Sequence, residues 1–443
     1  MRINLQELSR LVDLTLAYPM TNQIQKILGF LAVINLTCLG NGEAGSSELE
    51  ALKAQISLLN QQVVELEQLV QKKADSYRLP SRGRIVGGAV RPRSDLQMKG
   101  YLEVQYNDNL TQETSNVDGN PARFFDDNQD TFTLNAAALS FLKEANPEGG
   151  AGFHMDMVMG TNAQAMNEIT LGADTDADNF NLQQAFVEFV LPWKWGEGNA
   201  VLPDSIKVIL GRFVTLAGFE SLEAPPNWNI SRSFLFTFAE PGTHVGIRTN
   251  FGLLNDFFDV FLGLNNGWDN LIDNNSWKTL ESGLSFEPLQ DVTFVSAAYF
   301  GPENDRQSGH KRFLLAQTVQ WDATDRLTLV AAMDYGTERR TVLDSESEVL
   351  DFHNAQWYGY VAYARYQFTD QFAVAYRVEW FRDDDLFLTD TTTLWEQTVT
   401  AEYQWNENVI SRFEFRYDKD NDGNMFNGES HQATIGAQLV YII

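Results

Sequence analysis

The 443-residue chain has few of the residues on which thiol chemistry, membrane helices or nucleic-acid binding depend. Its one cysteine, Cys38, lies in an N-terminal apolar segment, so the remainder has no thiol for a disulfide, for cysteine catalysis or for a cysteine-based zinc site. After residue 45 no stretch approaches the roughly 20 continuous apolar residues that a membrane helix needs. Lys and Arg number 32 against 60 Asp and Glu, and a net charge of −28 argues against nucleic acid as a partner. The acidic surplus fits divalent cations as partners, or simply well-solvated loops.

Catalytic motifs are also missing. No G-x-S-x-G, H-E-x-x-H or glycine-rich phosphate loop frames any histidine of the chain. The sequence therefore predicts a protein that is not an enzyme and requires no cofactor. The histidines are His154, His244, His310, His353 and His431.

Aromatic residues, in contrast, are abundant and follow a two-residue period. In residues 356–381 one parity carries apolar side chains such as Tyr360 and Trp380, and the other carries polar ones such as Arg377 and Glu379. Such alternation is typical of a strand with one apolar and one polar face. Each arm of this hairpin runs for about ten residues, the length of a tilted transmembrane strand, whereas strands of soluble sandwiches run nearer five or six.

The same unit recurs along the chain and predicts about sixteen strands. An even number closes a single-chain bacterial barrel with both termini on one side, and short connections alternate with long polar loops as in outer-membrane proteins. The sequence thus predicts an all-β, transmembrane antiparallel β-barrel over residues 98–443, surrounded by lipid of the bacterial outer membrane. The strands are predicted to begin near Met98, Phe132, Gly152, Leu182, Ile206, His244, Phe257, Lys278, Val292, Arg312, Leu327, Gln356, Phe372, Leu394, Ile410 and His431.

The segment before the barrel divides into three parts. Residues 1–45 combine a start-site extension with a secretory signal peptide, whose apolar core is 27–39; Asn35 argues against the alternative of lipidation at Cys38. Residues 46–75 carry an apolar heptad pattern that predicts a periplasmic coiled coil, or alternatively an amphipathic helix packed on the barrel. The heptad residues do not decide between a two-stranded and a three-stranded coiled coil, so a homotrimer is inferred from the barrel class. The predicted oligomerisation residues are Leu49, Leu52, Ile56, Leu59, Val63, Leu66 and Val70.

An arginine-rich linker, residues 76–97, follows the heptads. Its basic residues could meet anionic lipid headgroups or cell-wall polymer through residues 76–96, or plug the barrel mouth; an ordinary solvated linker has the same composition. The linker carries Arg78, Arg82, Arg84, Arg91 and Arg93 against the single acid Asp95.

The loop near residues 214–242 is longer and more apolar than the other predicted loops. A loop washed by solvent should not hold Phe219, Trp228 and Phe234 together, so we predict that it folds into the lumen as a constriction, with a subunit contact as the alternative. Charges at a constriction set ion selectivity, although ordinary salt bridges would give the same set of residues. The predicted constriction residues are Arg212, Glu220, Glu223, Arg232, Glu240, His244 and Arg248. A mixed-charge ladder predicted to face the lumen, and to orient water and ions, comprises Arg377, Glu379, Arg412, Glu414 and Arg416.

The segments Gly211-Arg212, Ile230 to Ser233, Ala239 to Gly246 and Asn265 to Asp269 resemble the putative β-barrel porin type 2 family. The resemblance covers roughly residues 98–443 and implies a passive outer-membrane channel whose solute range is poorly defined. The leading coiled coil is similar to that of phosphate-selective-type porins. The chain departs from such barrels at its end, where Tyr441-Ile442-Ile443 replaces a terminal Phe or Trp.

The last long loop, residues 418–429, matches the calcium-loop pattern D-x-[DN]-x-[DN]-G-x5-E in full. Carboxylates at these spacings supply the hard oxygen ligands that Ca²⁺ prefers. Strands rather than helices flank the loop, and a chance match in an Asp-rich chain is the alternative. The predicted ligands are Asp418, Asp420, Asp422, Asn424 and Glu429.

Three functions follow from these patterns. The main hypothesis is a water-filled outer-membrane porin for passive diffusion of small hydrophilic solutes or ions. The alternative is a structural envelope protein that tethers the outer membrane to the cell wall through its coiled coil and linker. A weaker third hypothesis is an adhesin-like barrel that its third loop plugs.

Overall fold

The computed structural model describes residues 96–443 apart from 112–118, 147, 172–178, 194–200, 204, 255, 305 and 344–348. The predicted signal peptide, coiled coil and arginine-rich linker lie outside the described residues, and they stay predictions. The described part consists mainly of sixteen strands: β1 (Gln97–Asn109), β2 (Thr131–Lys143), β3 (Gly150–Met159), β4 (Phe180–Pro192), β5 (Ser205–Val214), β6 (Thr243–Leu253), β7 (Phe258–Asn265), β8 (Thr279–Leu289), β9 (Val292–Pro302), β10 (Lys311–Thr324), β11 (Leu327–Leu343), β12 (Val349–Gln367), β13 (Phe372–Asp383), β14 (Thr393–Gln404), β15 (Val409–Asp420) and β16 (His431–Ile442).

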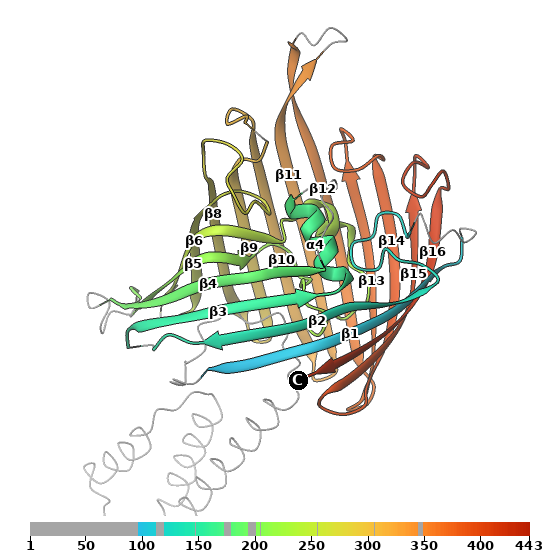
Figure 1. Cartoon of the computed structure of the whole chain (residues 1–443), viewed down its shortest axis with the longest axis horizontal. Helices are drawn as coiled ribbons and strands as arrows, with labels where there is room; N and C mark the ends of the chain where they lie inside the picture. The colour runs from blue at the N-terminus through green and yellow to red at the C-terminus, as the bar shows by residue number, and fades with distance from the viewer. Residues whose placement is uncertain are drawn as a thin grey trace, which may run out of the picture. The chain divides into compact units, whose positions relative to one another are not determined.

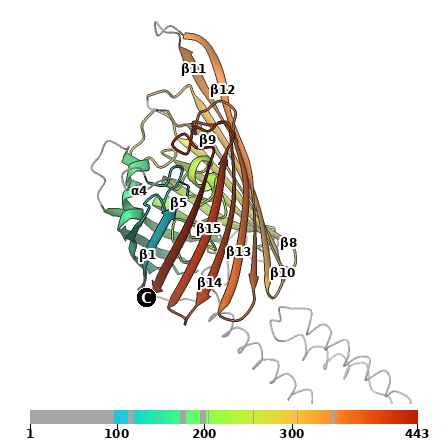
Figure 2. The same cartoon turned by 90° about the vertical axis from the view of Figure 1, so that its right-hand side faces the viewer.

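The strands form one closed antiparallel barrel. Each strand pairs with the next in the chain, and β1 pairs with β16, for example at Tyr106 and Ala437 (Figures 1 and 2). Closure leaves no sheet edge with unpaired N–H and C=O groups, which hydrocarbon could not satisfy. The predicted fold class is confirmed.

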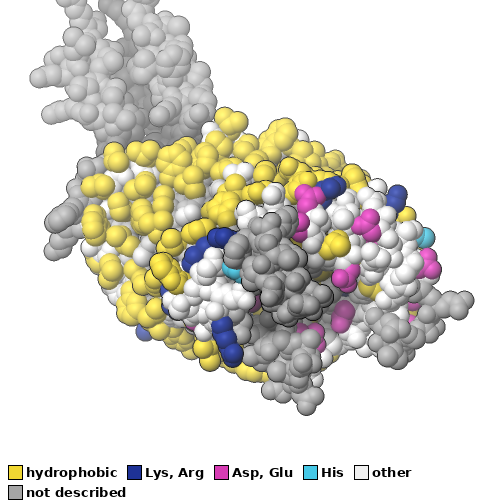
Figure 3. Space-filling model, turned by 90° about the horizontal axis from the view of Figure 1, so that it is seen from above, with side chains coloured by type: hydrophobic (Ala, Val, Ile, Leu, Met, Phe, Trp, Pro, Cys, Tyr) yellow, Lys and Arg dark blue, Asp and Glu magenta, His cyan; other side chains and the backbone are white. Residues whose placement is uncertain are grey.

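The two faces of the wall differ as the alternation predicts. Outward side chains are apolar and exposed, with Phe132 at 79% and Phe413 at 57% of their full exposure. Inward side chains are mostly polar, and Arg377 and Thr398 are fully buried. Figure 3 shows the hydrophobic side chains spread over the outside of the barrel. This arrangement, the reverse of a soluble protein, suits a barrel surrounded by lipid.

Fifteen of the sixteen strands begin within two residues of the predicted position. The exception is β12, which was expected near Gln356 and begins at Val349. It extends its pairing with β11 as far as Leu343, so this hairpin rises above the neighbouring strands (Figure 1). The sequence of this extension, VLDFHNA over residues 349–355, lacks the clean alternation that marks the other strands. Short turns at 290–291, 325–326, 368–371 and 405–408 lie at one end of the barrel.

Two helical segments interrupt the loops. Helix α4 (Thr161–Leu171) follows β3 and packs against β2, β3 and β4, and the π-helix η1 (Leu235–Ala239) lies between β5 and β6. Neither was predicted from the sequence. No helix among the described residues has the length and hydropathy to cross a membrane.

The segment between β5 and β6, residues 215–242, is named here the inner loop because it supplies the apolar core inside the barrel. Its Phe234 and Leu235 pack with the inward side chains of Trp357 and Val361. Two further apolar clusters, against other parts of the wall, also contain inner-loop residues, among them Leu216 and Leu222. Apolar residues in a long loop are thus buried here without a separate soluble domain.

Candidate functional site

Two glutamates of the predicted charge ladder bind the main chain of the inner loop. Glu379 on β13 accepts hydrogen bonds from both main-chain N–H groups of residues 234–235, at 2.6 and 2.7 Å. Glu414 on β15 accepts from the N–H groups of residues 230–231, at 2.7 and 3.0 Å. Hydrogen bonds to ionised carboxylates are stronger than neutral ones, so these four contacts hold the loop at two points.

Arg377 binds the loop and the wall at once. Its guanidinium donates to the Ser231 carbonyl at 2.8 Å and to the Ser231 hydroxyl at 3.0 Å. It also forms ion pairs with Glu220 of the loop, at 2.6 Å, and with Glu396 of β14, at 2.5 Å. All of these groups lie in the interior of the fold, where an unpaired charge would be costly.

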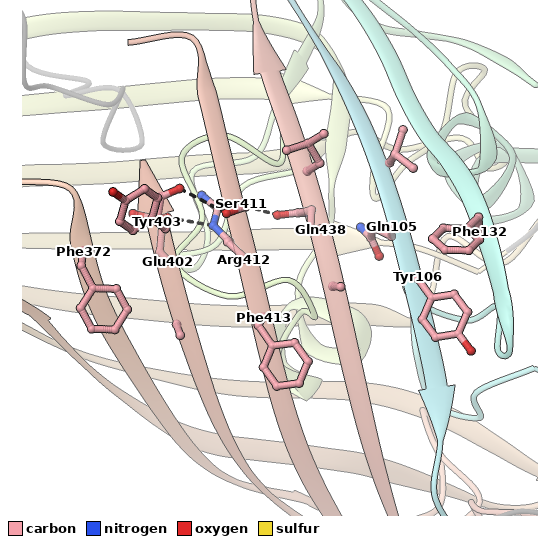
Figure 4. A pocket seen from close by; sticks show the side chains of 14 residues that line it. Gln105, Tyr106, Phe132, Phe372, Glu402, Tyr403, Ser411, Arg412, Phe413 and Gln438 are labelled. Atoms are coloured by element: carbon pink, nitrogen blue, oxygen red, sulfur yellow. Dashed lines mark hydrogen bonds and ion pairs between the residues drawn. The ribbon is translucent and has the colours of Figure 1, made fainter. Parts of the chain in front are cut away.

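The other two arginines of the ladder also donate to loop carbonyls. Arg416 donates to the Arg232 carbonyl at 2.5 Å. Arg412 donates to the carbonyl groups of residues 224–225, both at 3.2 Å. On its other side Arg412 pairs with Glu402 of β14 at 2.8 Å. Figure 4 shows Arg412 beside Glu402 and Gln438, with Phe372 and Phe413 pointing away from them.

The side chains of the ladder therefore face the interior, as the alternation predicts, but they are not exposed to water in the lumen. Its five side chains retain at most 4% of their exposure because the loop backbone covers them. The sequence analysis missed their partners Glu396 and Glu402, although both share one parity of β14 with Thr398 and Thr400. That parity was the signal that could have identified them.

Three of the predicted constriction residues lie on strands at the ends of the inner loop. Arg212 on β5 donates to the Leu182 carbonyl at 2.9 Å. Arg248 on β6 pairs with Glu281 at 2.5 Å and donates to the Val214 carbonyl at 3.0 Å. These contacts tie β5 to β4, and β6 to β5 and to β8, the second strand along the barrel.

His244, also on β6, is completely buried. Its Nδ1 lies 3.0 Å from the Gly267 carbonyl, and its ring stacks on Tyr299 with the centroids 4.8 Å apart. A side chain enclosed in this way supports the wall.

Three more of the set are engaged within the loop. Glu220 accepts from the Ser233 N–H at 2.7 Å besides pairing with Arg377. Arg232 donates to the Ser221 carbonyl at 2.9 Å, and burial lowers its pKa although the Glu220 charge opposes this shift. The Glu240 carboxylate lies against Gly218 and occupies the position that a β-carbon there would take.

Glu223 is the exception among the seven. Among the described residues, no side chain or N–H group donates to its carboxylate, and the side chain is partly exposed. The charges that act on it include those of Asp156 and His154 of β3, two residues that the sequence analysis did not assign to the site. Burial, followed by the charge of Asp156, raises the pKa of Glu223 to about 7. The predicted set is thus not one ring, because its members contact different parts of the fold.

Two external segments also enter the barrel. Arg123, between β1 and β2, forms an ion pair at 2.6 Å with Asp418 of β15, which is distant in the chain. Asn162 of helix α4 donates to Glu103 of β1 at 3.0 Å. The sequence analysis missed both segments because their contacts join residues distant in the chain, with no local periodicity.

The predicted calcium loop is only partly a loop, and its carboxylates are engaged. Asp418 and Asp420 belong to β15. The Asp418 oxygens accept from Arg416 and Arg123, both at 2.6 Å. Asp420 accepts from the main-chain N–H groups of residues 424–425 at 2.6 and 2.8 Å. Among the described residues no three His, Cys, Asp or Glu side chains cluster as metal ligands. Calcium binding by this segment stays a prediction.

Comparison with solved structures gives the same architecture. The barrel is similar to the outer-membrane channel DcaP of Acinetobacter baumannii, with a TM-score of 0.54 and 11% identity over 81% of this chain and 100% of that one. It is similar to OmpF of Salmonella typhi in a complex with daunomycin, with a TM-score of 0.52 and 13% identity over 78% and 97%. It is also similar to OmpT of Vibrio cholerae in its trimer form, with a TM-score of 0.50 and 8% identity over 79% and 99%. These likenesses concern the fold.

No curated protein matches the chain. A family model, described as "Putative beta-barrel porin-2, OmpL-like", matches residues 95–443, which include every strand of the barrel. The predicted resemblance and the predicted location are confirmed. The chain belongs to this porin family and is a channel protein of the bacterial outer membrane.

Proposed function

We propose that the barrel is a water-filled pore through which small hydrophilic solutes or ions diffuse passively, and that the inner loop narrows it. The observation that carries this proposal is the loop itself. Its backbone is held by charged side chains of β13 and β15, so it occupies part of the cross-section that the sixteen strands enclose. A loop held in this way narrows a pore without needing a ring of exposed charges.

Single-channel recording in planar bilayers tests the proposal. The full chain is compared with a variant that lacks residues 218–238, after both are shown to be folded by their heat-modifiable migration and β-sheet circular dichroism. Stepwise openings that become larger in the shortened variant support a pore that the loop narrows. Openings of equal size exclude the loop as the constriction, and silence of both folded proteins excludes the channel.

We propose further that three copies associate, with residues 46–75 joining them in the periplasm. The heptad pattern supports this, and the Vibrio cholerae relative was solved in a trimer form. A depression of about 640 Å³ on the lipid-facing wall, over the small residues Ala401 and Ala437, offers a surface for a second copy. Sedimentation in detergent, with and without residues 46–75, measures the association. A monomer in both forms would refute it.

A further inference from the structure

A group of basic and aromatic side chains lies at one rim of the barrel, where β8 and β10 begin. Trp277 and Lys278 directly precede β8, with 63% of the tryptophan and 45% of the lysine side chain exposed. Lys311 opens β10, and its Nζ lies 4.5 Å from the centroid of the Trp277 ring. A cation over the face of a tryptophan is attracted by the ring. Trp277 therefore holds this ammonium group in place. Together with the exposed Arg339 of β11, these residues are named here the basic rim patch.

The patch continues the lipid-facing side of the wall. Leu280 of β8 pairs with Phe300 of β9, which in turn pairs with Phe313 of β10. Leu280 and Phe300 are 56% and 48% exposed, so this row faces outward. Lys278 precedes Leu280 by two residues, and Lys311 precedes Phe313 by two. Because side chains two residues apart in a strand share one side of the sheet, the cations lie directly above an apolar row.

This rim is the outer end of the barrel. β8 runs from the patch to the short turn at 290–291, and β10 runs from it to the short turn at 325–326. Short turns of outer-membrane barrels face the periplasm, and long loops face the outside. The patch therefore lies at the end where the β11–β12 hairpin projects (Figure 1), beside the outer leaflet of the membrane.

Contacts between two external segments fix the patch over β9 and β10. The hydroxyl groups of Ser276 and Ser308 lie 2.6 Å apart. The Asn275 side chain donates to the Pro302 carbonyl at the end of β9, at 2.9 Å. The segment before β8 is thereby held against the segment before β10, so that Trp277 is presented in one position.

The charge of the patch is opposite to that of the chain. The chain carries a net charge of −28, whereas the patch holds three cations. The register of β10 and β11 brings Arg339 level with Lys311. Lys278 forms an ion pair with Asp273, and an ammonium group has three N–H donors, so Lys278 can bind a phosphate beside this carboxylate.

We propose that the basic rim patch binds the phosphorylated headgroup of an outer-leaflet lipid, whose acyl chains follow the row of Leu280 and Phe300 below it. A lipid of this kind places anionic phosphate above apolar chains, and this wall places cations above apolar side chains in the same order. The exposed tryptophan between them fits, since tryptophan is enriched at the boundary between membrane and water. The lipid site is separate from the surface proposed for a second copy, whose lining residues belong to β1, β2 and β13 to β16.

Native mass spectrometry of the folded full chain in detergent tests the proposal. The probes are lipid A, which carries phosphate groups, and its dephosphorylated form, which carries the acyl chains alone. The wild type should bind lipid A and bind the dephosphorylated form much more weakly. Lys278→Gln and Lys311→Gln should each weaken the binding of lipid A about five-fold, and the double variant about 25-fold, from the usual contribution of a basic residue near an anionic membrane surface.

Lys143→Gln is the matched control. It removes the same charge from an exposed lysine at the end of β2, at the opposite rim of the barrel, and should bind lipid A as the wild type does. Heat-modifiable migration shows that each variant is folded.

Four outcomes would overturn the proposal. Equal affinity of the wild type and the double variant for lipid A would refute the site, as would equal binding of lipid A and its dephosphorylated form. Inorganic phosphate that binds as tightly as lipid A would assign the patch to the free ion. A double variant that binds lipid A normally but no longer associates in sedimentation would assign this face to a second copy.

Discussion

Replacing Arg377 with methionine should release the inner loop from the wall and destabilise the whole barrel. The methionine keeps most of the volume but removes every hydrogen bond that the guanidinium makes to Ser231, Glu220 and Glu396. Both glutamates would then remain buried without this partner, at 4% and 1% exposure.

The expected cost follows from these stranded charges. Removing one partner of a buried ion pair typically costs about 3–5 kcal/mol, because the other charge stays in the interior. Arg416, 3.2 Å from Glu396, would still compensate part of that charge, so we expect a loss near the lower end, about 3 kcal/mol. The free energy of unfolding is measured by urea titration of the barrel refolded into lipid vesicles, with tryptophan fluorescence as the probe.

Arg365→Met is the matched control. Arg365 forms one ion pair, with Glu402 at 2.7 Å, and its side chain keeps 21% of its exposure. Such a pair contributes about 1 kcal/mol or less, and Glu402 would keep Arg412 as a partner. Equal losses in Arg377→Met and Arg365→Met would refute the view that buried charges hold the loop.

A double variant tests the same reasoning through recovery of stability. Adding Glu220→Gln to Arg377→Met removes one of the stranded charges and should recover part of the lost stability. Glu220→Gln alone should destabilise the protein, because Arg377 then loses one of its two acidic partners. A double variant less stable than Arg377→Met alone would mean that Glu220 acts through other contacts.

Three further expectations concern single residues. Millimolar Ca²⁺ should leave the melting temperature unchanged, whereas Asp418→Asn should lower it by several degrees through its arginine partners; a calcium-dependent increase would restore the calcium-loop hypothesis. Burial raises the pKa of Glu303 to about 7, so its protonated form is favoured in the folded state, and stability present below pH 4.5 should be lost as the pH rises through 7. Glu303→Gln should reduce this pH dependence of the urea midpoint, and an identical profile would contradict it. A β-carbon on Gly336 would overlap the Trp357 ring, so Gly336→Ala should cost about 1–3 kcal/mol, while Gly309→Ala, with open space around it, should cost little.

The barrel could be predicted from the sequence because its signal is local. Two-residue alternation over ten residues fixes strand and face together, and it needs no knowledge of distant partners. It failed only at the start of β12, where residues 349–355 extend the hairpin beyond the neighbouring strands. Helix α4 was not predicted because a single helix of 11 residues inside a loop carries no repeat.

The inner loop could be predicted as an enclosed segment, since five aromatic residues in one loop need burial. The roles of its charges could not be predicted. Glu220 and Arg377 are separated by more than 150 positions, and nothing in either local sequence indicates that they form a pair. Asp156 is likewise held by Gln184, 28 residues away in the chain, a contact that the sequence of β3 does not indicate.

A barrel in a membrane carries its charged side chains inside, the reverse of a soluble protein. Its interior must be polar because its outside faces lipid, so any loop that folds inward meets charged side chains. The cheapest way to satisfy those charges is to give them the N–H and C=O groups of the loop, which also need partners once they leave water. Glu379, Glu414 and Arg377 are used in this way.

The number of inward charges is then a poor measure of pore electrostatics, because most of them are neutralised by the loop that they hold. What an ion meets is then decided by the few inward side chains left without such a role. Ion selectivity should therefore respond weakly to the ladder, whose loss should appear first in stability.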